Sequence, residues 1–155
     1  MTQTIGIWLY RAIGAGTAIA IMELLARVAH QPLARVPFVT SIVLTIALPD
    51  SEPAQPYAVI GGHLLSCLAG FAALLAVGPG EASSAVAVGL AALLMLLARA
   101  MHPPAGIDAF LVAGLGLSPV WVLSPVLAGA ILLALFSRLW RAGERRLPRY
   151  FAARR

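Results

Sequence analysis

Four apolar stretches long enough to cross a bilayer constrain this chain more than any other feature. A hydrocarbon core of about 30 Å needs about 20 residues of helix. The chain of 155 residues is 61% hydrophobic and 11% charged, and its mean hydropathy is +0.92. Because helices satisfy their own backbone groups without water, we expect an all-α, multi-pass membrane protein. The four predicted transmembrane helices are Ile5 to Ala29, Tyr57 to Val77, Ser83 to Met101, and Val120 to Leu139.

Two shorter apolar segments, Phe38 to Leu48 and Ile107 to Leu117, complete the predicted fold. Each would extend about 16 Å as a helix, which is too short to cross a bilayer alone. Irregular backbone at membrane depth persists only when it is buried in protein or lines a wet cavity. We therefore expect two short re-entrant or broken helices.

A duplicated nonapeptide divides the chain into two units. LLARVAHQP (Leu24 to Pro32) and LLARAMHPP (Leu96 to Pro104) each end a long apolar run. This self-similarity predicts two sequence repeats, residues 5–78 and 79–140, within a single membrane domain covering residues 1–155. Each unit reads long helix, junction, short helix, long helix, and residues 141–155 form a basic tail.

The arginines predict the orientation in the membrane. Seven of the eleven lie between Arg138 and Arg155, and basic segments favour the cytoplasmic side. Four crossings would give parallel repeats, whereas six would give inverted ones. Both counts are even, so we expect cytoplasmic termini and a bacterial inner membrane. With four crossings the acidic loop holding Asp50 and Glu52 faces outward, as do Arg27, Arg35 and Arg99, against the positive-inside tendency.

The second junction has the chemistry of an anion site. Arg99 and His102 are three residues apart and would share one face of a continuing helix. Prolines then end that helix, and the next helix starts with free amide groups that favour anions. The residues assigned to this site are Arg99, His102, Pro103, Pro104, Ala105 and Gly106.

The first junction repeats this pattern with a different charge. Arg27 and His30 precede Pro32, but Glu23 lies four residues before Arg27 at a spacing that permits an ion pair. Its counterpart in the second copy is Met95, so the second junction is the better anion site. The alternative is structural: both arginines extend to the interface while the prolines turn the chain.

Other polar residues in the apolar segments are further candidates. His63 lies in the second long helix, and Thr40 and Ser41 open the first short helix with hydroxyl donors. Asp108 falls in the first turn of the second short helix, where the helix dipole favours a carboxylate. We rank this capping role above an alternative in which Asp108 pairs with Arg99 or His102 in a proton relay.

A stripe of small residues indicates close helix packing. Gly62, Ser66 and Gly70 recur every four residues, which places them on one helix face. Three histidines without clustered cysteines or carboxylates make a poor metal site. A hydrolase assembled from Ser66, His63 and Asp108 is the least favoured interpretation, and we expect no enzyme, no cofactor and no nucleic-acid partner.

Two motifs resemble a known family. MHPPAGIDAFL (Met101 to Leu111) and ALPDSEPAQPYAVIGGHLLS (Ala47 to Ser66) are similar to the HPP family of small integral membrane proteins. The resemblance implies four spans, and some plant and cyanobacterial members are implicated in nitrite transport across chloroplast or cell membranes.

The residues and the resemblance together predict transport of a small inorganic anion, with nitrite as the leading substrate. Arg99 would hold the anion, and His102 would adjust the local charge by titrating near neutral pH. Four spans enclose little space, so we expect a homo-oligomer in the lipid bilayer. The alternative is a non-transporting membrane subunit or anchor with a structural His-Pro hinge.

Overall fold

The computed structural model describes residues 2–30 and 36–147, and these residues form helices and turns with no strand. The predicted all-α class is therefore confirmed. Three short helices connect the main ones: η2 (Glu52–Ala54), η3 (Pro103–Ala105) and η4 (Val122–Leu127). The main helices are α1 (Thr2–Val28), α2 (Val39–Ala47), α3 (Pro56–Val77), α4 (Glu81–Leu97), α5 (Gly106–Leu115) and α6 (Ala128–Glu144).

Three helical segments are long and apolar enough to cross a membrane: Ile5–Val28, Pro56–Val77 and Val122–Glu144. The two predicted short helices are present as α2 and α5. The count of four long spans is not confirmed, because α4 has 17 residues, about 26 Å of helix. It ends four residues before Met101.

The early end of α4 has a local cause at Arg99. This residue adopts a left-handed backbone conformation with φ of 51°. The amide of Arg99 bonds to the carbonyl of Leu96, and the amide of Ala100 bonds to that of Met95, which is the hydrogen-bond pattern of a Schellman helix end. The prediction that Arg99 and His102 share one face of a continuing helix is therefore wrong.

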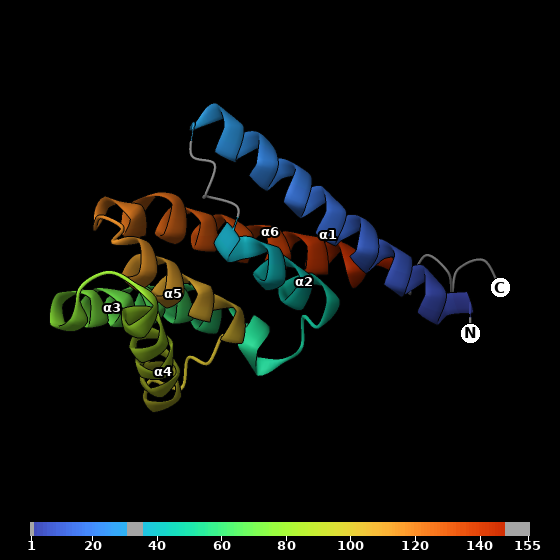
Figure 1. Cartoon of the computed structure of the whole chain (residues 1–155). Helices are drawn as coiled ribbons and strands as arrows, with labels where there is room; N and C mark the ends of the chain where they lie inside the picture. Colours follow the sequence, from blue (N-terminus) through green and yellow to red (C-terminus); the bar gives the residue numbers. More distant parts are fainter. Residues whose placement is uncertain (1, 31–35, 148–155) are drawn as a thin grey trace.

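The helices pack as two groups that share α3 (Figure 1). In the first group, α3, α4 and α5 pack through a core made mostly of alanines. In the second, α1 and α2 pack with α6 around Phe38 and Ile42, and Val59 of α3 joins this core. α1 lies along the outer edge of the molecule, away from α4 and α5 (Figure 1).

Charged and polar contacts bring three helix ends together. Arg11 of α1 bonds to Glu144 of α6 at 2.7 and 2.9 Å and to the carbonyl of Ala47, the last residue of α2, at 2.8 Å. Arg141 of α6 bonds to the carbonyl of Pro49 at 3.0 Å. We call this region the terminal end of the molecule, because the start of α1 and the end of α6 lie there (Figure 1).

The terminal end also holds the acidic loop, and this bears on the crossing number. Asp50 follows Pro49 directly and pairs with Arg141. The four-crossing alternative places the acidic loop and the termini on opposite sides of the membrane, so it is not confirmed by the contact of Asp50 with Arg141. The contact agrees with the six-crossing alternative. In that alternative α1 leads away from the terminal end, and the chain returns to it through α2.

The last predicted span is interrupted. Val120 to Leu139 was expected as one helix, but η4 contains Ser124 with the non-helical angles φ −143° and ψ 116°, followed by Pro125. Proline removes a backbone donor and breaks regular helix. α6 continues to Glu144, so the predicted basic tail begins inside a helix. Residues 148–155 and the junction residues Pro32 and Arg35 lie outside the described part of the chain.

The order of the helices agrees with the predicted units. α1 to α3 and α4 to α6 each run long, short, long, and a turn with positive φ at Gly78 and Gly80 connects them. Glycine adopts such angles without a steric penalty. The duplication itself stays a prediction.

Candidate functional site

Polar side chains from four segments meet in one buried cluster. Ser41 comes from α2, His63 from α3, His102 from the turn before η3, and Asp108 from α5. Each is 0% exposed. We call these four residues the buried cluster. Buried polar groups are costly unless they are hydrogen-bonded, so the contacts within the cluster determine whether it is stable.

The buried cluster forms one continuous hydrogen-bonded chain. Asp108 Oδ2 lies 2.5 Å from His63 Nδ1, and His63 Nε2 lies 3.2 Å from Ser41 Oγ. Ser41 Oγ in turn lies 2.9 Å from His102 Nε2, and His102 Nδ1 donates to the carbonyl of Pro53 at 2.7 Å. The chain therefore runs from a carboxylate on α5 to the backbone of η2.

The small-residue stripe of α3 allows this close approach. A side chain on Gly62 would place its Cβ 2.6 Å from His102 Cβ, and one on Gly70 would place it 2.8 Å from Val112 Cβ. Between them, Ser66 Oγ donates to the carbonyl of Ala105 at 2.6 Å and accepts from the amide of Ala109 at 3.1 Å. The predicted packing role of Gly62, Ser66 and Gly70 is confirmed.

The electrostatics of the cluster are dominated by the contact of Asp108 with His63. Both side chains are fully buried, and a buried charge is stable only beside a partner of opposite charge or after neutralisation. Asp108 Oδ1 has no hydrogen-bond partner among the described residues. The cluster therefore holds its protons where exchange with solvent is restricted.

His102 lies in the turn between α4 and η3, outside the helices that span the membrane. Burial, which disfavours the charged imidazole, lowers the pKa of His102 to about 4, and the nearby His63 acts in the same direction. The hydrogen bond to Pro53 opposes this shift only in part. Burial therefore favours the neutral imidazole of His102, and its role in adjusting the local charge stays a prediction.

Three of the predicted site residues come together and the arginines do not join them. Ser41, His63 and His102 belong to the buried cluster, whereas Arg99 is exposed. Thr40 is also exposed, one residue before Ser41 on the opposite face of α2. The predicted pairing of Arg99 with His102 at one anion site therefore has no counterpart in the geometry.

The two predicted junctions lie at opposite ends of the molecule. Arg27 is 16 residues beyond Arg11 on α1, about 24 Å along the helix, and both Arg27 and His30 are exposed. His102 instead contacts Pro53, in the loop that belongs to the terminal end. The left-handed residue that follows α1 is His30, with φ of 53°, whereas the one that follows α4 is Arg99. In the repeat His30 corresponds to His102, so α1 ends three residues later in its unit than α4 does.

The expected free amides of the second junction are already in use. The amide of Ala105 donates to the carbonyl of His102 at 2.9 Å, and that of Gly106 donates to the carbonyl of Pro103. Both prolines serve to form the turn of η3. The prediction that these amides bind an anion is wrong, because their protons point at protein carbonyls.

Asp108 lies in the first turn of α5, as predicted, but its carboxylate has a partner that the sequence did not indicate. No side-chain cap is present at the start of α5, and the carboxylate contacts His63 on another helix. The available signal was the pairing of types: His63 and Asp108 are isolated ionisable residues of complementary charge in two apolar segments, and such residues in membranes usually pair. Spacing alone gave no reason to join them, since 45 residues separate them.

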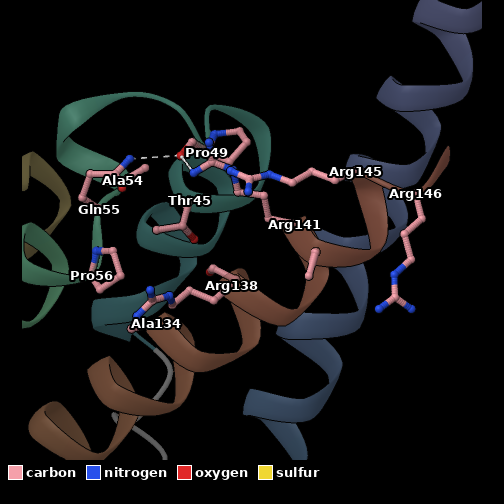
Figure 2. A pocket seen from close by; sticks show the side chains of 12 residues that line it. Thr45, Pro49, Ala54, Gln55, Pro56, Ala134, Arg138, Arg141, Arg145 and Arg146 are labelled. Atoms are coloured by element: carbon pink, nitrogen blue, oxygen red, sulfur yellow. Dashed lines mark hydrogen bonds between the residues drawn. The ribbon is translucent and has the colours of Figure 1, made fainter. Parts of the chain in front are cut away.

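A basic pocket opens at the terminal end, between the end of α6, the end of α2 and η2 (Figure 2). Its volume is about 430 Å³. We call it the arginine pocket, because four of its lining residues are arginines: Arg138, Arg141, Arg145 and Arg146. In the sequence these arginines indicate only the orientation in the membrane, and their pattern gives no signal for a pocket.

The pocket carries net positive charge. Arg141 pairs with Asp50, but Arg138 and Arg145 have no carboxylate partner among the described residues. Figure 2 shows Arg138 extended toward Pro56, and Arg141 and Arg145 gathered near Pro49, whereas Arg146 extends away from them. Thr45 and Ser137 add hydroxyl groups to the lining. The interior of the pocket is thus suited to an anion.

The arginine pocket lies beside the buried cluster. Thr45 lines the pocket one helical turn after Ser41 on α2, and both are buried. Ala54 lines it directly after Pro53, whose carbonyl accepts from His102. Within the described residues, no group of three His, Cys, Asp or Glu side chains is placed to hold a metal ion.

Comparisons with known proteins bear on these features. The family model described as "HPP, transmembrane region" matches residues 1–148. A transmembrane protein of Dictyostelium discoideum is 33% identical over 107 residues, which is 63% of this chain and 37% of that protein. The chain thus spans little more than a third of that relative's length. No solved structure matches the chain.

Proposed function

The chain belongs to the HPP transmembrane family, and on this premise we propose that it transports a small inorganic anion across the membrane. Nitrite is the leading substrate. The observation that carries the proposal is the arginine pocket, which gathers four guanidinium groups at one end of an apolar helical bundle. A channel or carrier for anions needs such a region to concentrate its substrate.

The pocket suits a planar oxyanion. Guanidinium groups hold planar oxyanions through paired, charge-assisted hydrogen bonds. Arg138 extends from α6 toward Pro56 (Figure 2). The hydroxyl of Ser137, the preceding residue, is buried without a hydrogen-bond partner among the described residues. We therefore place first contact with the anion at Arg138, in preference to the junction arginines Arg27 and Arg99.

The orientation and assembly of the transporter are part of the same proposal. The arginine-rich terminal end would face the cytoplasm of a bacterial cell, in keeping with the positive-inside tendency. Only 17% of the most apolar window of α1 is buried within one chain. We propose a homo-oligomer in which this helix contributes to the contact between subunits.

The test is anion flux in liposomes. The full chain is purified and reconstituted, and uptake of nitrite is followed against protein-free vesicles. Arg138→Ala should slow uptake about tenfold, the effect of losing one charge-assisted hydrogen bond worth about 1.5 kcal/mol. Arg99→Ala is the matched control, because Arg99 is exposed outside the pocket, and it should retain the wild-type rate.

Two other functions give different results. A non-transporting membrane subunit or anchor would fold and insert without protein-dependent nitrite flux, and that result would sink the transport proposal. An intramembrane hydrolase is suggested by the order Asp108, His63, Ser41, which resembles a catalytic triad. We disfavour it because Ser41 is 0% exposed, so its hydroxyl is closed to a substrate.

A further inference from the structure

The buried cluster lacks one proton when both histidines are neutral and Asp108 is a carboxylate. His63 Nδ1 then donates to Asp108, and His102 Nδ1 donates to the carbonyl of Pro53, so both Nε2 atoms are acceptors. They face the same hydroxyl, Ser41 Oγ, at 3.2 and 2.9 Å, and the carbonyl of Pro37 lies 3.3 Å from that hydroxyl as a further acceptor. One hydroxyl proton cannot satisfy two acceptors, and an unsatisfied buried nitrogen costs about 1–3 kcal/mol.

One additional proton completes the chain. Asp108, as a carboxylic acid, donates from Oδ2 to His63 Nδ1, and His63 Nε2–H donates to Ser41 Oγ. The Ser41 hydroxyl then donates to His102 Nε2 at 2.9 Å, the shorter of its two contacts with acceptors, since the carbonyl of Pro37 lies at 3.3 Å. His102 Nδ1–H donates to Pro53. Each donor and acceptor from Asp108 Oδ2 to the carbonyl of Pro53 now has a partner, whereas Asp108 Oδ1 still has none among the described residues. The cluster has no net charge.

The same protons can be arranged along the chain in a second way, without movement of any heavy atom. The Asp108 proton passes to His63 Nδ1, the His63 Nε2 proton passes to Ser41 Oγ, and the Ser41 proton passes to His102 Nε2. Asp108 becomes a carboxylate and His102 an imidazolium, so the net charge stays zero. The chain can therefore deliver positive charge from α5 to the turn before η3.

We propose that the buried cluster carries one proton with each anion, so that the protein works as a proton-anion cotransporter. This inference rests on the proposed anion transport. The delivered charge appears at His102, beside the Pro53–Ala54 segment that walls the arginine pocket. A cation there strengthens the attraction of the pocket for an anion, and loss of the proton weakens it.

Other charged or titratable groups near the chain lie on each neighbouring element. On α3, Cys67 is buried and within electrostatic range of Asp108. On η2, Glu52 is exposed and bonds to Tyr57. From α6, Arg138 faces the pocket, and from α4 the apolar Met95 packs near Gly62. Within the described residues, the chain from Asp108 to His102 is the route formed by connected donors and acceptors.

The experiment measures the driving force of nitrite uptake. Proteoliposomes at neutral pH receive either a pH gradient, acidic outside, with the membrane potential clamped at zero, or a membrane potential without a pH gradient. One-to-one coupling is electroneutral, so one pH unit should raise the accumulation of nitrite about tenfold, and the potential should have no effect. Protein-free vesicles subtract passive entry of nitrous acid.

Variants locate the coupling. Asp108→Asn and Ser41→Ala interrupt the proton chain, so nitrite movement should become insensitive to the pH gradient and responsive to the potential. Ser84→Ala is the control, because Ser84 is buried on α4 and bonds only to the carbonyl of Phe110; its uptake should stay coupled.

Wild-type uptake that follows the potential and ignores the pH gradient would overturn the coupling and leave anion transport standing. Unchanged coupling in both variants would also overturn it. Absence of any protein-dependent nitrite flux in the wild type would overturn the proposed function and the coupling together. The wild-type measurement decides the coupling even if Asp108→Asn fails to fold.

Discussion

Ser66 shows how one small residue positions the buried cluster. Its hydroxyl donates to the carbonyl of Ala105 and accepts from the amide of Ala109, so it fixes the first turn of α5 against α3. Asp108 lies in that turn, next to the amide that Ser66 holds. The position of the carboxylate beside His63 therefore depends on a residue that does not touch it.

We expect Ser66→Ala to destabilise the protein by about 2 kcal/mol. The substitution removes two buried hydrogen bonds, each worth about 1 kcal/mol. Thermal or denaturant-induced unfolding in detergent measures the change. Ser51→Ala is the control, since Ser51 Oγ makes one exposed contact with the carbonyl of Leu48, and it should stay within about 0.5 kcal/mol of wild type. Equal effects of the two would show that Ser66 does not anchor α5.

Arg99 provides a second prediction at this scale. A left-handed backbone costs a residue with a Cβ about 1 kcal/mol, and glycine avoids that cost. Arg99→Gly should therefore be about 1 kcal/mol more stable than Arg99→Ala in the same unfolding assay, because both lack the guanidinium and differ only at Cβ. Identical stabilities would mean that φ of 51° at this position carries no strain.

The sequence predicted which polar residues belong to the site better than it predicted which of them contact one another. His63 and Ser41 were identified because polar groups are rare in apolar segments, and His102 because it lies in the duplicated nonapeptide. Their contact with Asp108 depends on how α2, α3 and α5 meet, which local sequence does not encode. The arginine pocket was not predicted for the same reason. Its arginines indicate only the orientation in the membrane, and the pocket forms because α6 packs beside η2.

At the scale of elements, the face of α3 that carries Gly62, Ser66 and Gly70 determines how closely the second unit can approach. Without strong apolar driving forces between helices in lipid, close packing and hydrogen bonds hold them together. The spacing of these residues predicted that face correctly. It is the one place where a helical period alone led to the site.

Two glycine substitutions test this packing with opposite signs. Gly62→Ala places a Cβ 2.6 Å from His102 Cβ, and such overpacking typically costs 1–3 kcal/mol. Gly89→Ala, inside α4 with no atom within 4 Å of the added Cβ, should stabilise by about 0.5 kcal/mol through helix propensity. Unfolding midpoints of both variants in detergent give the comparison. A neutral Gly62→Ala would contradict the close contact of α3 with the His102 turn.

Helix order was easier to predict than helix ends. Apolar run length predicted six helical segments in the observed order. The end of α4 depends on the left-handed turn at Arg99, and the break in η4 depends on Ser124 and Pro125. Both features are local backbone conformations that a hydropathy pattern does not predict. They change which residues lie on the same helix face.

At the scale of the whole molecule, each predicted unit contains three helical segments. Because three is an odd number, the second unit starts at the opposite end of the molecule from the first and runs in the reverse direction. α1 starts at the terminal end, the α3–α4 turn lies at the other end, and α6 returns. Under the proposed orientation, with the terminal end in the cytoplasm, Arg99 would no longer conflict with the positive-inside tendency. The reversed direction also explains why His30 and His102, which occupy equivalent positions in the two nonapeptides, lie far apart.

Cysteine accessibility tests this topology directly. In a Cys67→Ala background, single cysteines are introduced by Glu52→Cys, Glu81→Cys, Arg99→Cys and Arg146→Cys, all at exposed positions, and a membrane-impermeant maleimide is added to intact cells or to opened vesicles. Positions 52, 99 and 146 should react from one side and position 81 from the other, because α3 carries the chain from the acidic loop to the α3–α4 turn. Four crossings would instead place 81 with 146 and 52 on the opposite side. Reaction of 52 and 146 from opposite sides would therefore refute the arrangement in which the arginine pocket, the acidic loop and the end of α6 share one face of the membrane.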